Sequence, residues 1–315
     1  MSLTRSAALA RSPAMTQPAS PRRLCADIGG SFIKFAAVDE AGALRDERRV
    51  ATATGDWPAF AASLAELCGA APASVPLCLS IAGVADPESG IATVANIPCV
   101  SGRRLGTELS AALGRPVRVA NDADCFVLAE AQRGAAQGAR IVFGIILGSG
   151  VGGGLVVDGR IVEGAGGVSG EWGHGPVMGR RLVGTRALEP FACGCGQAGC
   201  LDAVGSARGL ERLDAFLNGA PRTSLAIVDA WNEGERGAGE AVELYLDLVS
   251  GPLAMVVNLT GASAVPVAGG LSNSERLVAA LDAAVRARIL RRTAEPLVVR
   301  SVLGADAGLI GASLL

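Results

Sequence analysis

A short pattern of strand, glycine-rich turn and strand occurs twice in this chain, once in each half. In the first copy, the apolar runs Leu24–Ile28 and Ile33–Asp39 flank the turn at Gly29-Gly30. In the second copy, Arg140–Val157 carries the turn Gly148-Ser149-Gly150 between two apolar runs. Glycine at such turns lets the backbone approach a ligand closely. The repeat therefore predicts a duplicated two-lobe α/β fold with a ligand cleft between the lobes.

The segments between and after the two copies alternate between helical and extended periodicity. Helices are predicted at Trp57–Cys68, Ala123–Gln132, Gly205–Leu217, Ala238–Val257 and Ser274–Leu290, and strands at Leu44–Thr54, Val75–Ile81, Val117–Ala120 and Val265–Ala268. We expect a first lobe at 23–138, completed by a C-terminal helix at 304–315, and a second lobe at 139–303. Residues 1–22, rich in Ala, Ser and Pro, are expected to form a disordered leader.

Charge balance and composition argue against several classes of partner. Lys+Arg total 28 against Asp+Glu 30, and basic residues never run longer than a pair, which argues against a nucleic-acid surface. No apolar stretch reaches the roughly 20 residues that span a bilayer, and Ala7–Ala10 is too short for a signal peptide. We therefore expect a cytoplasmic protein without nucleic-acid or membrane partners. Its eight cysteines are then thiols or metal ligands rather than a disulfide framework.

The strongest chemical motif consists of Cys193, Cys195 and Cys200, preceded by the only histidine of the chain, His174. Three thiolates and one imidazole match a closed tetrahedral zinc site, and the intervening glycines allow three sulfurs to aim at one ion. Four protein ligands leave no open position for water, so such a zinc ion would be structural. The alternative is three free buried cysteines.

The two glycine turns each present several backbone N–H groups that a phosphate could accept. Neither is a P-loop, because the Gly-Lys-Ser/Thr ending is missing, and the first does not fit the dinucleotide-binding pattern. The alternative is a pair of ordinary hairpin turns. In the first turn, the carboxylate of Asp27 could hold a hydrated Mg²⁺ beside bound phosphates.

Asn121-Asp122 stands between a predicted strand and a predicted helix. A carboxylate at this position can accept a proton from an attacking hydroxyl, as phosphoryl transfer requires. The alternative is a helix N-cap, a position that both residue types favour.

Two acidic residues flank the predicted metal site. Glu171 precedes His174 by three residues, so a bound zinc ion would fix its carboxylate for hydrogen bonds to a polyol, and Asp202 follows Cys200 on the other side. The alternative is a solvated surface glutamate.

Taken together, these residues resemble the ROK family of bacterial sugar kinases and repressors, within the actin-like (ribonuclease H-like) ATPase fold. The resemblance runs from about Leu24 to the C-terminus, and its order and spacing are highly specific. Beyond the motifs above, it includes Ala82-Gly83, the adenosine-type segment Gly269–Asn273 and Asp306-Ala-Gly308. The segments Ala95–Pro98, Asn121–Phe126 and Ala268–Asn273 are similar in particular to bacterial N-acetylglucosamine kinases.

The resemblance implies ATP-dependent phosphorylation of the 6-hydroxyl of a hexose or N-acetylhexosamine, with N-acetylglucosamine as the first choice. Glucokinase, fructokinase or N-acetylmannosamine kinase activity are the alternatives. Asp122 would be the catalytic base. The implied sugar-binding residues are Gly83, Asn96, Asn121, Asp122, Glu171, His174 and Asp202, and the implied ATP-binding residues are Asp27, Gly29, Gly30, Ser31, Gly148, Ser149, Gly150, Gly152, Gly153, Gly269 and Gly270. ATP, Mg²⁺ and a structural Zn²⁺ held by His174, Cys193, Cys195 and Cys200 complete the expectation, together with a homodimer.

The chain departs from the family pattern at three places. Asp202 stands where Glu is usual, Asp124 where Asn is usual, and Ser31-Phe32 where Thr-Lys is usual, with Lys34 two residues later. A repressor of the same family would carry a winged helix of 60–80 residues, yet only 26 residues precede Asp27 here. The retention of Asp122 favours an enzyme. A non-catalytic sugar-sensing regulator is the second alternative.

Overall fold

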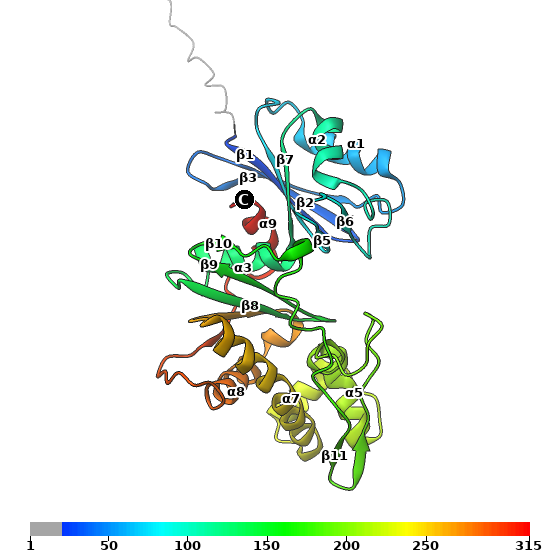
Figure 1. The fold of residues 1–315 in the computed structure, drawn as a ribbon, viewed down its shortest axis with the longest axis vertical. Helices are drawn as coiled ribbons and strands as arrows, with labels where there is room; N and C mark the ends of the chain where they lie inside the picture. The colour runs from blue at the N-terminus through cyan, green and yellow to red at the C-terminus, as the bar shows by residue number, and fades with distance from the viewer. Residues whose placement is uncertain (1–20) are drawn as a thin grey trace, which may run out of the picture.

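A computed structural model describes residues 21–315 and shows two lobes stacked along the long axis of the molecule (Figure 1). The first lobe is built on a five-stranded sheet in the order β3-β2-β1-β4-β7. Its strands are β1 (Arg23–Ile28), β2 (Phe32–Val38), β3 (Leu44–Ala51), β4 (Leu77–Ile81) and β7 (Val117–Asn121). β1, β2 and β3 form an antiparallel meander, whereas β1, β4 and β7 run parallel. Two helices, α1 (Trp57–Cys68) and α2 (Leu105–Leu113), and the short hairpin of β5 (Val84–Ala85) and β6 (Ala92–Thr93) complete the lobe.

The second lobe repeats this sheet with the same order and the same strand directions. The order is β10-β9-β8-β13-β14. The strands are β8 (Ile141–Leu147), β9 (Val151–Val157), β10 (Arg160–Ile161), β13 (Val265–Ala268) and β14 (Val298–Arg300). β8, β9 and β10 are antiparallel neighbours, and β8, β13 and β14 are parallel. The duplicated two-lobe α/β fold predicted from the glycine-turn repeat is therefore confirmed.

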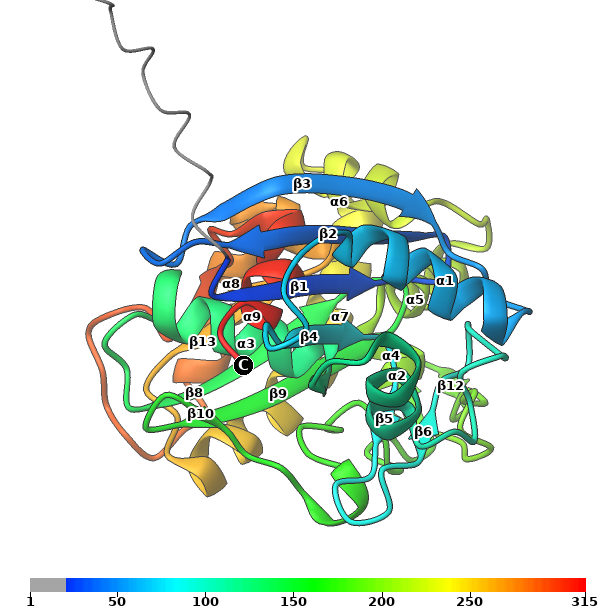
Figure 2. The same cartoon turned by 90° about the horizontal axis from the view of Figure 1, so that it is seen from above.

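Two helices fill the space between the sheets, as the view from above also shows (Figure 2). α3 (Asp122–Arg133) packs against β8 and β9, and α9 (Ala307–Ala312), which follows the short 3₁₀ turn η3 (Gly304–Asp306), packs against β1, β4 and α3. The chain thus returns at its C-terminus to the first sheet. Glu130 of α3 secures this return, because its fully buried carboxylate accepts hydrogen bonds from Ser301 Oγ (2.5 Å) and Leu303 N (3.2 Å).

Helices cover the second sheet on its outer side. They are α4 (Asp202–Gly205), α5 (Ala207–Asn218), α6 (Ser224–Asn232), α7 (Arg236–Thr260) and α8 (Glu275–Arg286), with the 3₁₀ turn η2 (Gly270–Asn273) before α8. Within residues 21–315, α7 alone is long and apolar enough to cross a bilayer, although no apolar stretch of that length was expected. Its packing against α4, α5, α6 and α8, with Tyr245 fully buried, makes it the core helix of this lobe.

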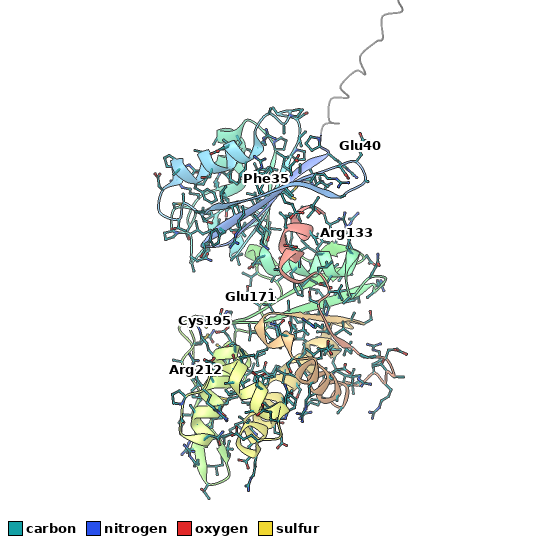
Figure 3. The ribbon with its side chains drawn as sticks, turned by 180° about the vertical axis from the view of Figure 1, so that it is seen from behind. Phe35, Glu40, Arg133, Glu171, Cys195 and Arg212 are labelled. Carbon is teal, nitrogen blue, oxygen red and sulfur yellow. The ribbon has the colours of Figure 1, made fainter. Side chains whose placement is uncertain are left out.

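The segment that carries the cysteines has little regular structure. It contains the 3₁₀ turn η1 (Ala165–Gly167) and the hairpin of β11 (Arg181–Val183) and β12 (Arg186–Leu188). Figure 3 shows Glu171 and Cys195 on the side of the second lobe that faces the first lobe. Residues 1–20 lie outside the described residues, so the predicted leader at 1–22 stays a prediction, except that Arg22 N already donates to Val38 O (2.8 Å).

Candidate active site and metal centre

The first glycine turn joins β1 to β2 and is closed by a hydrogen bond from Gly29 N to Phe32 O (3.0 Å). Asp27 precedes this turn in β1, and its Oδ1 accepts a hydrogen bond from Ser80 Oγ of β4 (2.7 Å). Gly30 lies beside Asn96, because a Cβ on Gly30 would come within 3.2 Å of the Asn96 amide nitrogen. The turn predicted to bind phosphate is therefore adjacent to a residue predicted to bind sugar.

Asn121 and Asp122 lie where β7 passes into α3. Asn121 is the N-cap of this helix, since its Oδ1 accepts from Ala123 N (2.8 Å) and Asp124 N (3.2 Å). Its amide nitrogen donates to Gly83 O (2.9 Å), which brings two predicted sugar ligands together. Asp122 Oδ1 accepts from Ala123 N (2.9 Å), and its second carboxylate oxygen has no hydrogen-bond partner among residues 21–315. The capping alternative thus describes Asn121, while Asp122 keeps a free acceptor.

Electrostatics link Asp122 to the other carboxylates of this region. Burial is the main cause that raises the pKa of Asp122, and the negative charges of Asp27 and Glu171 raise it further, against the hydrogen bond from Ala123 N. Burial also raises the pKa of Asp27, against the hydrogen bond from Ser80 and the charge of Lys34. Asp27, Asp122 and Glu171 come from three separate segments, and the fold brings the charges of Asp27 and Glu171 close enough to act on Asp122. A carboxylate with a raised pKa and a free oxygen is suited to accept a proton.

The four predicted metal ligands converge. One ligand atom from each of His174, Cys193, Cys195 and Cys200 lies within 4.8 Å of all the others. The Cys193 sulfur is 3.7 Å from His174 Nδ1, and the Cys195 and Cys200 sulfurs are 3.6 Å apart. A tetrahedral zinc ion with Zn–S bonds of about 2.3 Å would hold its sulfurs about 3.8 Å apart. The donor set and its spacing therefore fit one structural zinc ion.

The lowered pKa of the Cys195 thiol and the orientation of the imidazole suit a metal. The backbone N–H of Gln197 lowers the pKa of Cys195 to about 7, whereas burial raises that of Cys193 to about 11. Because Nδ1 of His174 faces the sulfurs, its Nε2 faces Glu171, whose Oε2 is 3.8 Å away. In a metal-bound imidazole, the ring nitrogen that does not bind the metal often faces a carboxylate. The imidazole thus turns its other ring nitrogen towards Glu171, at a distance longer than a hydrogen bond.

Asp202 connects the cysteine cluster to the second glycine turn. Its Oδ1 accepts from Val151 N (2.7 Å), and its Oδ2 is 3.9 Å from the Cys193 sulfur. A Cβ on Gly150 would come within 2.9 Å of the same Oδ1, so the turn passes directly over this carboxylate. A sugar contact is expected of Asp202 from the resemblance, whereas its nearest partner in the structure is Val151 N at the end of the second glycine turn.

The glycines of the second loop divide into two groups. Gly148, Ser149 and Gly150 form the turn between β8 and β9, and a Cβ on Gly269 would come within 2.7 Å of Gly148 N. Gly152 and Gly153 lie inside β9 instead, where Gly152 O accepts from Trp172 Nε1 (2.8 Å). Gly153 has no room for a side chain, since a Cβ there would come within 2.7 Å of the Trp172 ring. Gly153 thus makes room for the segment that carries Glu171.

One cavity adjoins the second glycine turn through Gly269, and another lies between the lobes away from both turns. The first, of about 280 Å³, is lined by Ala268, Gly269, Ser272, Asn273, Arg300, Ser301, Gly304 and Ala305. A second, of about 430 Å³, lies between the lobes beside Asn121 and Asp124, and Glu163 and Gly167 line it from the second lobe. Asp122, Glu171 and His174 do not line this second cavity, so it is separate from the carboxylate and metal arrangement described above.

Asp124 is an unusual buried acid. It is 9% exposed, and its Oδ1 has no hydrogen-bond partner within residues 21–315. Burial, followed by the charges of Asp122, Glu171 and Glu163, raises the pKa of Asp124 to about 7. A carboxyl whose folded pKa exceeds its unfolded value contributes its full stability only below the unfolded pKa, and that stability is lost as the pH rises towards 7.

We therefore expect Asp124→Asn to become increasingly more stable than the wild type as the pH rises. The gap in unfolding free energy should grow by about 3 kcal/mol between pH 4 and pH 8. Denaturant unfolding across this range measures it, with the same exchange at the exposed Asp229 as a control that should show no such trend. A pH-independent gap for Asp124→Asn would show that its carboxyl ionises freely in the folded protein.

Sequence reasoning missed Ser80 and the packing role of Gly308. Ser80 is a fully buried hydroxyl within the apolar strand β4, and that polar interruption was the available signal. A Cβ on Gly308 would lie 2.7 Å from Asp27 Oδ1, so only glycine lets α9 approach this carboxylate. Both residues shape the surroundings of Asp27 from elements remote in sequence.

Comparisons with known proteins agree with this architecture. The family profile described as ROK family matches residues 23–315. The N-acetyl-D-glucosamine kinase of Vibrio cholerae is 34% identical over 295 residues, which cover 92% of this chain and 97% of that protein. The N-acetylgalactosamine kinase AgaK of a Shewanella species is 33% identical over 293 residues, covering 92% and 94%. The crystal structure of a ROK hexokinase from Thermus thermophilus superposes with a TM-score of 0.79 at 31% identity, covering 93% and 96%. This chain belongs to the ROK family.

Proposed function

We propose that this protein is an ATP-dependent sugar kinase that phosphorylates the 6-hydroxyl of a hexose or N-acetylhexosamine. The observation that carries the proposal is the position of Asp122. It begins α3 at the face between the lobes, keeps one carboxylate oxygen free, and lies within electrostatic reach of Asp27 and Glu171. Full-length relatives named as sugar kinases, at 34% and 33% identity, support the same reading.

In this proposal the residues act in three groups. The sugar is bound by Gly83, Asn96, Asn121, Glu171 and His174, which direct its 6-hydroxyl towards Asp122. Asp122 accepts the proton as the oxygen attacks the γ-phosphorus, and the bond from that phosphorus to the leaving ADP breaks. The backbone N–H groups of the two glycine turns bind the phosphates, and the cavity at Gly269 holds the adenosine. Asp27 would hold hydrated Mg²⁺, which neutralises phosphate charge when bound. Closure of the lobes would exclude water from this arrangement.

The proposed zinc ion has a structural role. It would be bound by His174, Cys193, Cys195 and Cys200, and would hold the segment from Gly170 to His174 against β9. Asp202 then joins the same cluster to the second glycine turn through Val151 N. One ion would thereby position both Glu171, which is proposed to bind the sugar, and the second glycine turn, which is proposed to bind phosphate. We therefore assign the zinc ion to orientation of the site and not to the chemical step.

For the substrate we propose N-acetylglucosamine, with N-acetylgalactosamine, N-acetylmannosamine, glucose and fructose as the comparison set. We expect N-acetylglucosamine to give the highest kcat/KM and glucose a lower one. A site built to bind one polar group of its substrate rejects analogues that lack it, because its own buried polar groups are left unpaired. Coupled ADP release over this sugar panel is the measurement. A preference for glucose or fructose by tenfold or more, about 1.4 kcal/mol in the barrier, would contradict the acetamido assignment and leave the sugar-kinase proposal in place.

A further inference from the structure

Nearly all basic residues of this chain are arginines, and lysine is rare. Of the 28 Lys and Arg residues, 27 are arginine, and Lys34 is the only lysine. It lies in β2 directly opposite Asp27 of β1 in the antiparallel register. Residues paired in this way project from the same face of a sheet. The ammonium group of the only lysine, Lys34, therefore lies on the sheet face that carries Asp27.

Within residues 21–315, Lys34 Nζ makes two hydrogen bonds, both with the C-terminal segment before α9. Its Nζ donates to Ala305 O (2.6 Å) and to Asp306 Oδ1 (3.1 Å). An ammonium has three donors, so two are used and one remains. The side chain is 32% exposed, and that of Asp306 61%, so this ion pair is open to solvent and contributes little to stability. One donor of a half-exposed cation is thus available to a ligand.

The position of Lys34 connects the two ends of the proposed nucleotide site. Ala305, whose carbonyl it contacts, lines the 280 Å³ cavity together with Gly269. On its other side, the charge of Lys34 acts on Asp27 beside the first glycine turn. A triphosphate that extends from this cavity towards Asp122 would pass the ammonium.

The residues proposed to bind the nucleotide include no cationic side chain. They are glycines, serines and Asp27, and Asp27 would act on the phosphates only through Mg²⁺. Two arginines lie nearby, and both already have partners. The guanidinium carbon of Arg49 is 3.7 Å from the centroid of the Phe32 ring, and Nη1 of Arg300 is 3.7 Å from Oε1 of Glu275. An ammonium has three donors on a flexible stem, so one donor can contact a phosphate oxygen while the other two keep their partners.

We propose that Lys34 binds the phosphate chain of ATP through its third N–H donor, while its hydrogen bond to Ala305 O keeps the ammonium beside the cavity. This inference rests on the proposed kinase function and extends it to a residue outside the predicted nucleotide set. The competing interpretation is that Lys34 only ties the C-terminal segment to β2. The two interpretations differ in what removal of Asp306 does, because that change breaks the tie and spares the ammonium.

The first experiment measures binding of a non-hydrolysable ATP analogue with Mg²⁺ by calorimetry. Lys34→Met should weaken binding about 10- to 100-fold, the effect of losing one charge-assisted hydrogen bond to phosphate. Lys34→Arg should recover part of the loss, and Asp306→Asn should bind within about threefold of the wild type. Arg236→Met, which removes the same charge at a site 93% exposed on α7, is the control for net charge and should also be unchanged. Binding of sugar alone and the thermal midpoint should be unaltered in Lys34→Met.

The second experiment uses the uniqueness of the lysine. An amine-selective reagent can modify only Lys34 and the N-terminal amine, which serves as an internal reference. The saturating analogue should slow modification of Lys34 at least tenfold relative to the N-terminus. Equal loss of analogue binding in Lys34→Met and Asp306→Asn, wild-type affinity in Lys34→Met, or unchanged modification of Lys34 would each overturn the inference. If the wild type binds sugar but never the analogue, the proposed kinase function fails first, and this inference with it.

Discussion

Cys195→Ser is expected to lose its zinc and to unfold at a temperature at least 10 °C below that of the wild type. Cys195 is an exposed residue, so its exchange creates no cavity and any destabilisation reports on the metal. Structural zinc contributes its binding free energy directly to folding, and apparent values reach about 10–16 kcal/mol in zinc-finger peptides. Loss of one ligand in four should remove several kcal/mol, and each kcal/mol shifts the midpoint by about 2–4 °C in a protein of this size class.

The measurement combines elemental analysis of protein purified without added metal with a thermal scan. The wild type should contain about one zinc ion per chain, and a strong chelator should lower its midpoint towards that of Cys195→Ser. Cys99→Ser is the matched control, since Cys99 lies outside the cluster and donates only to Ala53 O. A zinc-free wild type that is folded and active would favour the alternative of free thiols.

Asp122→Asn is expected to retain sugar binding and to lose turnover by 10²-fold or more. The amide keeps the shape of the carboxyl, and its oxygen can still accept the hydrogen bond from Ala123 N that Asp122 accepts now. It cannot accept the proton of the attacking hydroxyl, and general-base assistance contributes on the order of 10²–10⁴-fold. Steady-state kinetics and sugar binding by calorimetry separate the two properties.

A helix-capping role for Asp122 predicts the opposite pattern. Asn is as good a cap as Asp, so turnover would then be nearly unchanged. Asn121→Ala provides the comparison, because Asn121 is the observed N-cap of α3 and its loss should lower stability by about 1 kcal/mol. Near-normal turnover in Asp122→Asn would refute the role of Asp122 as the catalytic base.

Much of the fold was predictable because its signals are local. The helix Trp57–Cys68 and the strand Val265–Ala268 were predicted with the bounds that the structure shows. The helix α2 was missed because it has no side-chain cap, has Gly106 in its first turn, and buries only Leu105 and Leu109. The helix predicted at Gly205–Leu217 in fact begins at Ala207, where Ser206 leaves the helical conformation and caps α5. A helix with a weak cap and a short apolar face depends on tertiary packing for its stability, and a single sequence does not show that packing.

The candidate site also contains some features that the sequence predicted and others that it could not. Residue types and spacing indicated the four metal ligands, and the structure brings their ligand atoms together. Spacing could not show that Asp202 accepts from Val151 N, because the direction of that carboxylate depends on how the second glycine turn folds over it. Ser80 and Gly308 were likewise beyond local reasoning, since they meet Asp27 only after β4 and α9 have packed on β1.

Analysis of the reaction product is the most direct test of the kinase proposal. The purified protein is incubated with ATP, Mg²⁺ and N-acetylglucosamine, and the sugar is examined by mass spectrometry and phosphorus NMR. We predict a sugar monophosphate with the phosphoryl group on the 6-oxygen, formed in equal amount to ADP and absent with Asp122→Asn. Binding of sugar without phosphate transfer to any sugar of the panel would contradict the proposal and favour a non-catalytic sugar-sensing regulator.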